Sequence, residues 1–238
     1  MSGAVAIIIP ALNEEASIES VVRSIPNPPV RHIIVVDNGS TDRTAALARG
    51  VLATVVQEPR RGYGSACLAG IRALPSDVDV VVFMDADGSD DASQLRALVT
   101  PIEEGRADLV VGARRPIEAG ALTPQQRVGN AVAAWWLRAR FGIAATDLGP
   151  FRAIRRSSLL RLGMRDPDYG WTVEMQIRAA RIGLGYEEIV VPYRRRIGRS
   201  KISGTFKGTL LASFKILGLL ARYDLLQSTR LGRAWGYR

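Results

Sequence analysis

The sequence predicts a doubly wound α/β fold, in which a mostly parallel sheet carries helices on both faces. Short runs rich in valine and isoleucine alternate with helix-like segments through the first half of the chain. These runs are continuously apolar, which is typical of parallel strands buried on both faces. Ligands of such a fold bind at the carboxyl ends of the strands.

The elements of the first half follow one another in regular alternation. Strands are expected at residues 4–9, 32–36, 51–56, 78–84 and 109–111. Helices are expected from residues 13–14 to the prolines at 26–29, and at 41–49, 64–74 and 93–104. Glycine, proline and capping residues separate these segments.

The second half is less regular. Helices are expected at residues 125–140, 157–162, 171–182 and 205–226, with a loop and strand over 147–155 and a strand at 188–192. No linker marks a second independent domain. We therefore expect one α/β domain at residues 1–204, followed by a basic, amphipathic helical tail at residues 205–238.

Positive charge is concentrated near the carboxyl end of the chain. The 238 residues carry a net charge of +9, and residues 181–238 hold 12 lysines and arginines against three acidic residues. Residues 1–180 are neutral. This asymmetry predicts an anionic partner for the C-terminal quarter: phosphate groups, acidic lipid headgroups or nucleic acid.

The rarer residues argue against several classes of protein. Cys67 is the only cysteine and His32 the only histidine, which argues against an internal disulfide, a zinc site and a histidine-based triad. The N-terminus lacks the basic region of a signal peptide, and no uninterrupted apolar window reaches the ~18–20 residues of a membrane span. We expect a cytoplasmic protein.

The sharpest motif is Asp85-Ala86-Asp87, directly after the expected strand 78–84. Two carboxylates one residue apart, where a buried strand ends, can share a hard divalent cation such as Mg²⁺ or Mn²⁺. Such a cation offsets the charge that develops on a diphosphate leaving group. The alternative is an ordinary polar loop, because two aspartates at this spacing are common.

Acidic residues also follow the first two expected strands. Glu14 lies beyond the first expected strand and Asp37 follows the second. Adjacent strand ends form the nucleotide crevice of a doubly wound sheet, where both carboxylates could accept hydrogen bonds from a ribose or a base. The alternative is helix capping, because Asn13 and Ser40 are good N-cap residues.

Four ordered segments carry a resemblance to a known family. They read IIIPALNEE at 7–15, IIVVDNGSTDRT at 33–44, RGYGSA at 61–66 and VFMDADGS at 82–89. With the later motifs, they resemble the inverting family 2 glycosyltransferases, which have the Rossmann-like GT-A fold. The resemblance implies a UDP- or GDP-sugar donor, Mg²⁺ or Mn²⁺ at Asp85 and Asp87, and inversion at the anomeric carbon. It implies donor contacts at Pro10, Leu12, Glu14, Asp37, Gly64, Asp85, Ala86 and Lys201.

Within this family the chain resembles the polyprenyl-phosphate (dolichyl-phosphate) mannosyl- and glucosyltransferases. The matching segments lie at 112–114, 127–130, 147–152 and 193–201. The resemblance implies an acceptor phosphate held by Arg114, Arg127 and Arg152. It also implies a donor diphosphate held by Arg196 and Lys201, and arginine forks do match phosphate oxygens.

Two positions depart from the pattern of these relatives. Ser89 stands where they often have a glutamine or another metal ligand, so a water or a neighbouring acid would complete the metal shell. Gly149-Pro150 stands where they have Ser-Gly, which leaves the acceptor open.

The acceptor decides whether catalysis needs a general base. A phosphate is already ionised near neutral pH, whereas a hydroxyl acceptor must lose a proton. Glu174 and Asp147 are the candidate bases. The other expected catalytic residues are Asp87, as a metal ligand, and Arg196, as a cation. For Glu174 the alternative is an ion pair with Arg178, one helical turn away.

Two segments are candidate membrane contacts. Residues 206–223 combine a broad apolar face with cationic residues, and Trp135-Trp136 lies beside Arg138 and Arg140. Both patterns are typical of helices at a membrane interface, and they favour a peripheral protein on the inner face of the membrane. The alternative is that both helices pack within the protein or against a second subunit of a homodimer.

Other functions compete with this interpretation. A soluble glycosyltransferase would share the donor chemistry and use a sugar or another alcohol as acceptor. A nucleotide- or polyanion-binding protein would keep the fold without catalysis. Nucleic acid is not an expected partner, because the basic tail lacks interleaved aromatic residues. A dinucleotide-dependent oxidoreductase is excluded, because the glycines of RGYGSA do not follow the first strand.

Overall fold

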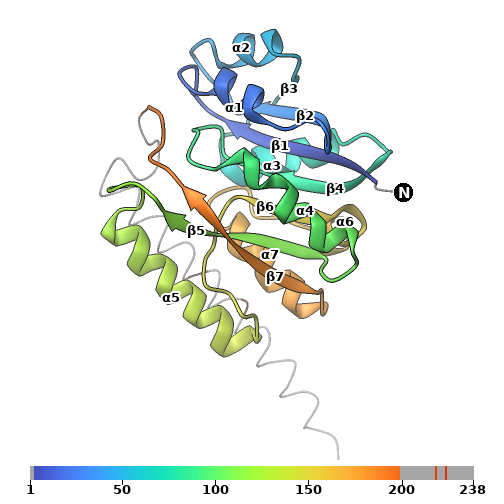
Figure 1. Ribbon diagram of the computed structural model, residues 1–238, viewed down its shortest axis with the longest axis vertical. Coiled ribbons are helices and arrows are strands. Elements are labelled where there is room, and N and C mark those ends of the chain that lie inside the picture. The colour runs from blue at the N-terminus through green and yellow to red at the C-terminus, as the bar shows by residue number, and fades with distance from the viewer. Residues whose placement is uncertain (1–2, 199–217, 219–222, 224–238) are drawn as a thin grey trace, which may run out of the picture.

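The computed structural model describes residues 3–198 together with Gly218 and Tyr223, and in this part of the chain a seven-stranded sheet lies between two layers of helices (Figure 1). The strands are β1 (Ala4–Ala11), β2 (Val30–Asp37), β3 (Thr54–Gln57), β4 (Val78–Phe83), β5 (Leu109–Pro116), β6 (Arg152–Arg155) and β7 (Tyr186–Tyr193). The helices are α1 (Ile18–Ser24), α2 (Thr44–Gly50), α3 (Tyr63–Arg72), the 3-10 helix η1 (Ala92–Gln94), α4 (Leu95–Glu103), α5 (Pro124–Phe141), α6 (Arg156–Leu162) and α7 (Trp171–Arg181).

The strand order is β3-β2-β1-β4-β6-β5-β7. Neighbouring strands are parallel except at β6, which runs antiparallel to both β4 and β5. This confirms the predicted, mostly parallel α/β sheet. The chain runs outward from β1 through β2 to β3 and then returns to β4 on the other side of β1. Doubly wound folds bind their ligands at such a switch point, beyond the carboxyl ends of the strands.

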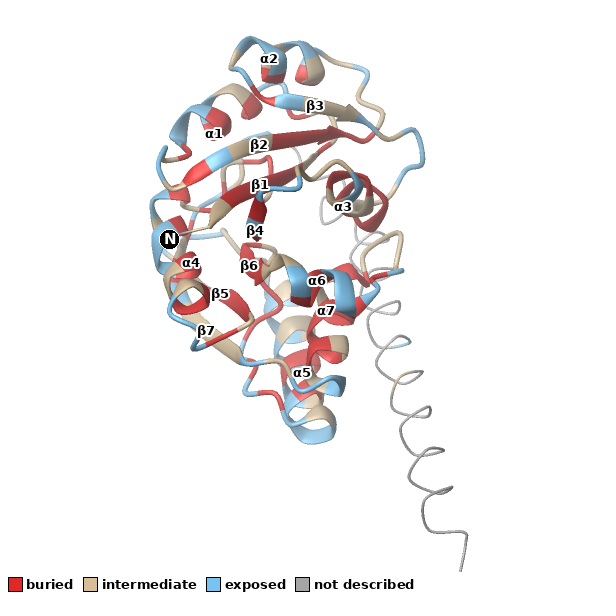
Figure 2. Cartoon of the chain, turned by 90° about the vertical axis from the view of Figure 1, so that its right-hand side faces the viewer, coloured by how far each residue is buried: buried red, intermediate tan, exposed pale blue. Residues whose placement is uncertain are grey.

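Alternate residues of β1 face two separate cores. Val5, Ile7 and Ile9 pack with α1, α2 and α4 on one face of the sheet, whereas Ala6 and Ile8 pack with α3, α6 and α7 on the other. Figure 2 shows the buried strands between the two helical layers. The continuous apolar run of β1 follows from this arrangement, because each of its side chains enters one core or the other.

Helix α5 lies outside these layers, at the edge of the molecule (Figure 1). Its buried residues Ala133 and Leu137 pack against Val173 and Ile177 of α7. Thr123 begins the helix with a capping box, and the left-handed backbone of Gly142 ends it. One side of α5 therefore packs against α7, and the opposite side is exposed.

Asn13 and Ser40 do not cap the helices that follow, so the alternative given for the strand-end acids does not hold. Helix α1 begins at Ile18 and α2 at Thr44, several residues later than expected. The Asn13 N–H donates to Ser40 Oγ at 2.9 Å, and the Thr41 N–H donates to the Asn13 side-chain oxygen at 2.7 Å. These side chains thus join the loops after β1 and β2 instead of beginning the helices.

The end of β5 also differs from the expectation, which placed this strand at 109–111. β5 extends to Pro116 because it pairs with β7 along its whole length. The helix expected at 205–226 and the donor residue Lys201 lie outside the described residues, apart from Gly218 and Tyr223. Among the described helices, none combines the length and the apolar character needed to span a bilayer.

Candidate active site

A pocket of about 440 Å³ opens beyond the carboxyl ends of β1, β2 and β4. Its lining includes a group of the residues predicted from sequence, namely Pro10, Leu12, Glu14, Asp85, Ala86, Asp87 and Arg196. It also includes residues that sequence reasoning did not identify, namely Ala11, Asn38, Arg61, Gly62, Tyr63, Ala66, Asp168 and Tyr169. The structure therefore brings together three predicted segments that are far apart in the sequence.

Asp85 and Asp87 bring two carboxylates to this pocket. The buried side chains of Met84 and Ala86 anchor the loop that follows β4. Burial, and next the negative charge of Asp87, raise the pKa of Asp85 to about 7. A raised pKa means that burial and the neighbouring carboxylate disfavour the ionised form of Asp85 more than the nearby arginines favour it. Two hard oxygen ligands with excess negative charge fit Mg²⁺ or Mn²⁺.

Other acidic and polar groups surround this pair. The Ser89 hydroxyl donates to Asp87 Oδ1 at 2.6 Å, so it holds this carboxylate in place. The buried Asp90 accepts the Asp85 N–H at 3.1 Å on Oδ2. Its Oδ1 has no hydrogen-bond partner in the described chain. Burial, and next the charge of Asp85, raise the pKa of Asp90 well above its usual value.

The protein supplies few ligands for a cation in this arrangement. In the part of the chain that the structure describes, no group of three or more His, Cys, Asp or Glu side chains could hold a metal ion. The aspartate pair would therefore leave coordination positions for oxygens of a substrate or water, which is how Mg²⁺ is usually bound beside phosphates.

The segment after β7 fixes the loop of the aspartate pair. The Ile197 N–H donates to the Asp87 carbonyl at 2.8 Å, and the Arg194 N–H donates to the Ser89 carbonyl at 2.9 Å. Between them, Arg196 Nη2 donates to Glu14 Oε1 at 2.8 Å, and Arg196 Nη1 lies 3.4 Å from Asp87 Oδ2. Arg196 thereby joins the loop after β1 to the aspartate loop.

Asn38, and not the predicted Asp37, forms the pocket wall at the end of β2. Asn38 Nδ2 donates to the carbonyls of Glu58 at 2.9 Å and Arg60 at 2.8 Å, and its Oδ1 accepts the Gly62 N–H at 2.8 Å. Asp37 is buried, and its Oδ1 accepts the Ser40 N–H at 3.0 Å. The position of Asn38 close to the end of the predicted strand 32–36 was the available signal, and in the structure Asn38 directly follows β2.

Gly64 has a packing role and does not line the pocket, although a donor contact was expected there. A Cβ at this position would lie 2.0 Å from the Asp166 carbonyl oxygen. At Gly62, where φ is +135°, it would lie 2.2 Å from the Pro167 carbonyl oxygen. The glycines of RGYGSA thus allow residues 166–168 to approach α3. This contact brings Asp168 to the pocket, and no local sequence motif predicts the position of Asp168.

Arg114 and Asp147 form a buried ion pair beside the pocket. Arg114 Nε donates to Asp147 Oδ2 at 2.7 Å and Arg114 Nη2 donates to Oδ1 at 2.8 Å. Burial alone would raise the pKa of Asp147, but the hydrogen bonds and charge of Arg114 outweigh it, and that pKa lies below its usual value. Asp147 is therefore a carboxylate whose charge is matched.

Arg152 points into the protein and not toward an acceptor. Its guanidinium donates to the carbonyls of Gly149 at 3.0 Å, Thr172 at 2.9 Å and Leu148 at 3.0 Å. The side chain is fully buried, and burial lowers its pKa. In this arrangement it supports the loop that carries Asp147, so the expected phosphate contact has no basis. Arg127 is exposed on α5, outside the pocket lining.

Glu174 forms the ion pair that was the alternative to a general base. Its Oε1 accepts Arg178 Nε at 2.7 Å, and its Oε2 accepts the N–H groups of Arg165 at 3.0 Å and Asp166 at 2.7 Å. Glu174 is buried and does not line the pocket. It holds the segment that leads to Asp168.

Comparison with known proteins agrees with this geometry. The family profile described as glycosyl transferase family 2 matches residues 6–163. The chain belongs to this family. It is accordingly a glycosyltransferase, as its motifs predicted.

Relatives of this glycosyltransferase span most of its length. An uncharacterized glycosyltransferase of Mycobacterium tuberculosis is 44% identical over 211 residues, which cover 88% of this chain and 94% of the relative. The undecaprenyl-phosphate mannosyltransferase of Micrococcus luteus is 31% identical over 241 residues, which cover 94% of this chain and 98% of the relative.

A solved structure shows the same fold. Glucosyl-3-phosphoglycerate synthase of Mycobacterium tuberculosis, in complex with Mn²⁺, UDP-glucose and phosphoglyceric acid, has a TM-score of 0.77 at 27% identity, covering 93% of this chain and 80% of the synthase. The predicted GT-A fold is thereby confirmed. Further structures of the synthase contain UDP with Mn²⁺ or Mg²⁺, which agrees with the expected cofactor.

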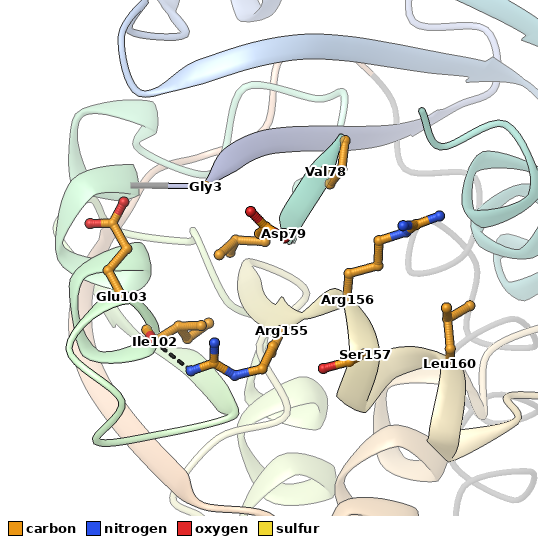
Figure 3. A pocket seen from close by; sticks show the side chains of 10 residues that line it. Gly3, Val78, Asp79, Ile102, Glu103, Arg155, Arg156, Ser157 and Leu160 are labelled. Carbon is orange, nitrogen blue, oxygen red and sulfur yellow. Dashed lines mark hydrogen bonds between the residues drawn. The ribbon is translucent and has the colours of Figure 1, made fainter. Parts of the chain in front are cut away.

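The glycosyltransferase has a second pocket, of about 370 Å³, at the amino ends of β1 and β4 (Figure 3). Both signs of charge line it, among them Asp79, Glu103 and Arg155. Arg155 donates to the Ile102 carbonyl at 2.6 Å and so contributes to the structure of this edge. None of the predicted site residues lies there, and the carboxyl ends of all strands but the antiparallel β6 are at the opposite edge of the sheet.

Proposed function

We propose that this glycosyltransferase transfers a sugar, with inversion, from a UDP- or GDP-sugar to a polyprenyl phosphate. The observation that carries the proposal is the meeting of Glu14, Asp85, Asp87 and Arg196 in one pocket at the strand ends. The polyprenyl acceptor is supported by the mannosyltransferase of Micrococcus luteus, because that similarity spans 94% of this chain. A lipid acceptor would bring the enzyme to the membrane surface, and we place it on the cytoplasmic face.

Asp85 and Asp87 are the residues that would hold Mg²⁺ or Mn²⁺. The fit rests on their two carboxylates and on the burial and the neighbouring charge of Asp87, which raise the pKa of Asp85. The bound cation would supply positive charge for the departing diphosphate. Arg196 places a guanidinium beside the same carboxylates, so it adds positive charge at the leaving group. Glu14, at the other end of the Arg196 contact, would orient the nucleoside.

The acceptor proposal rests on the placement of the predicted bases. Asp147 and Glu174 are both held by arginines and neither lines the pocket. A phosphate oxygen attacks without a general base, because it is already ionised. Arg61, an exposed lining residue, is the cation available to such an acceptor at the rim of the pocket.

A soluble phosphorylated alcohol is a second candidate acceptor. It is favoured by the synthase structure that contains phosphoglyceric acid. A hydroxyl acceptor needs a base, and Asp168 is the lining carboxylate that lies outside the aspartate pair and Glu14. The two acceptors therefore differ in what they require of Asp168.

Transfer assays with two acceptors test the proposal. The purified protein is incubated with Mn²⁺ and each UDP- or GDP-hexose, together with a short-chain polyprenyl phosphate or phosphoglyceric acid. We expect transfer to the polyprenyl phosphate, and we expect Asp168→Asn to retain most of it. Transfer to phosphoglyceric acid alone, with a loss of ~10²–10⁴-fold in Asp168→Asn, would replace the lipid acceptor by the soluble one.

A further inference from the structure

The outer side of α5 carries an apolar stripe made of Val128, Val132 and Trp135. These residues are 64%, 40% and 61% exposed. Their spacing of four and three residues places them on one side of the helix. The other side holds Ala133 and Leu137, which pack toward α7. Single exposed apolar residues are ordinary on protein surfaces, whereas a contiguous stripe with a tryptophan marks a contact surface.

The charges around the α5 stripe indicate the chemistry of its partner. Arg127, Arg138 and Arg140 on the same helix are exposed. The sequence of α5 contains no Asp or Glu. If a second copy of this chain docked through the same face, arginines would meet arginines without acids from α5 to balance them, which is unfavourable. The charge therefore favours an anionic partner that also accepts apolar side chains.

We propose that the α5 stripe docks on an anionic lipid bilayer. Tryptophan favours the headgroup region of a bilayer. The valines would enter the boundary with the acyl chains, while arginine side chains extend to lipid phosphates. A nucleic acid would match the arginines but would not bury the valines.

The position of α5 relates this surface to the active site. Helix α5 follows β5, whose carboxyl end lies at the same edge of the sheet as that of β4, because both strands run antiparallel to β6. Asn130 of α5 accepts the Leu148 N–H at 2.9 Å, next to the ion-paired Asp147. Docking through α5 would bring the pocket edge to the bilayer, so the inference deepens the proposed function and rests on it for its purpose.

Vesicle co-sedimentation of the full chain tests the α5 stripe without any substrate. The test variant combines Val128→Ser with Trp135→Ala, and the matched control is Leu160→Ala, an apolar residue of α6 that is 57% exposed. On phosphatidylcholine vesicles that contain phosphatidylglycerol, we expect the affinity of the test variant to fall at least ~10-fold, which is about 1.4 kcal/mol. The control should match the wild type. Both variants keep the C-terminal tail, so a selective loss belongs to α5.

Vesicle binding by a charge variant, the oligomeric state and sugar transfer separate the possible outcomes. Arg140→Gln should lower binding to anionic vesicles but not to pure phosphatidylcholine. Unchanged vesicle binding by the α5 variant would overturn the inference and leave the proposed function standing. A dimeric wild type whose α5 variant is monomeric would overturn it too, because the stripe would then be a subunit interface. Vesicle binding through α5 without transfer to short-chain polyprenyl phosphate would refute the proposed acceptor alone. Circular dichroism confirms that each variant is folded.

Discussion

Two groups of acidic residues in this protein have opposite surroundings, although both were candidates for catalysis. Asp85 and Asp87 share the pocket, and the pKa of Asp85 is raised to about 7. Asp147, in contrast, accepts hydrogen bonds from two nitrogens of the Arg114 guanidinium, and its pKa is lowered. A carboxylate with unbalanced charge is available to a cation, whereas a matched one holds the structure together. Counter-charge, more than residue type, distinguishes the two groups.

The largest expected effect is at the Asp85 and Asp87 pair. Asp87→Asn should lower kcat by about 10³-fold, because loss of a metal-bound charge costs several kcal/mol of transition-state stabilisation and 1.36 kcal/mol is tenfold in rate. Sugar transfer at saturating Mn²⁺ measures it. The matched control is Asp79→Asn, which changes an exposed aspartate at the opposite edge of the sheet and should leave kcat unchanged. Full metal-dependent activity in Asp87→Asn would show that this carboxylate does not hold the cation.

The matched pair should respond through stability. Arg114→Met leaves Asp147 buried without its counter-charge, and breaking such a pair costs about 3–5 kcal/mol. Urea denaturation measures the free energy of unfolding. Adding Asp147→Asn to Arg114→Met should restore much of the loss, because the buried charge is then absent. If the single variant were as stable as the wild type, the contrast between the two acidic groups would fail.

The sequence was most informative where a function depends on local order. The strand-end motifs of β1 and β4 pointed to Glu14, Asp85 and Asp87, and these residues line one pocket because the carboxyl ends of parallel strands meet at one edge. The helix starts were less predictable, since Asn13 and Ser40 bond across two loops instead of capping. Asp168 escaped prediction because its place depends on a long-range approach of residues 166–168 to Gly62 and Gly64. Arg152 looked like a phosphate ligand only until its burial was known.

The raised pKa of Asp85 predicts that the free energy of unfolding of the metal-free protein depends on pH. The unfolded chain ionises this group near its usual pKa, whereas the folded protein holds the proton until about pH 7. The folded state therefore binds more protons in this window, so the free energy of unfolding falls as pH rises toward 7 and then levels. In metal-free buffer at pH 8, Asp85→Asn should be more stable than the wild type by up to about 4 kcal/mol, because the folded protein raises the pKa of this group to about 7.

This stability difference has two internal controls. It should shrink at pH 5, where the wild-type carboxyl is protonated. Mn²⁺ should reduce or reverse it, because a cation that binds only the folded wild type stabilises it by mass action. Thermal unfolding across this pH range with and without Mn²⁺ gives all the comparisons. A gap that is independent of both pH and Mn²⁺ would mean that the charge of Asp85 is offset by other groups.

The smallest expected effect on turnover is at Glu174, whose carboxylate is fully engaged away from the pocket. Glu174→Gln should leave kcat within about threefold, whereas loss of a general base costs ~10²–10⁴-fold. It should lower the free energy of unfolding by about 1–2 kcal/mol, because the charge-assisted bonds to Arg178 and to two backbone N–H groups are weakened. Arg178→Gln, which removes the other half of the pair, should show the same pattern. A large loss of kcat in Glu174→Gln, together with loss of the acidic limb of the pH–rate profile, would instead make Glu174 the base and favour a hydroxyl acceptor.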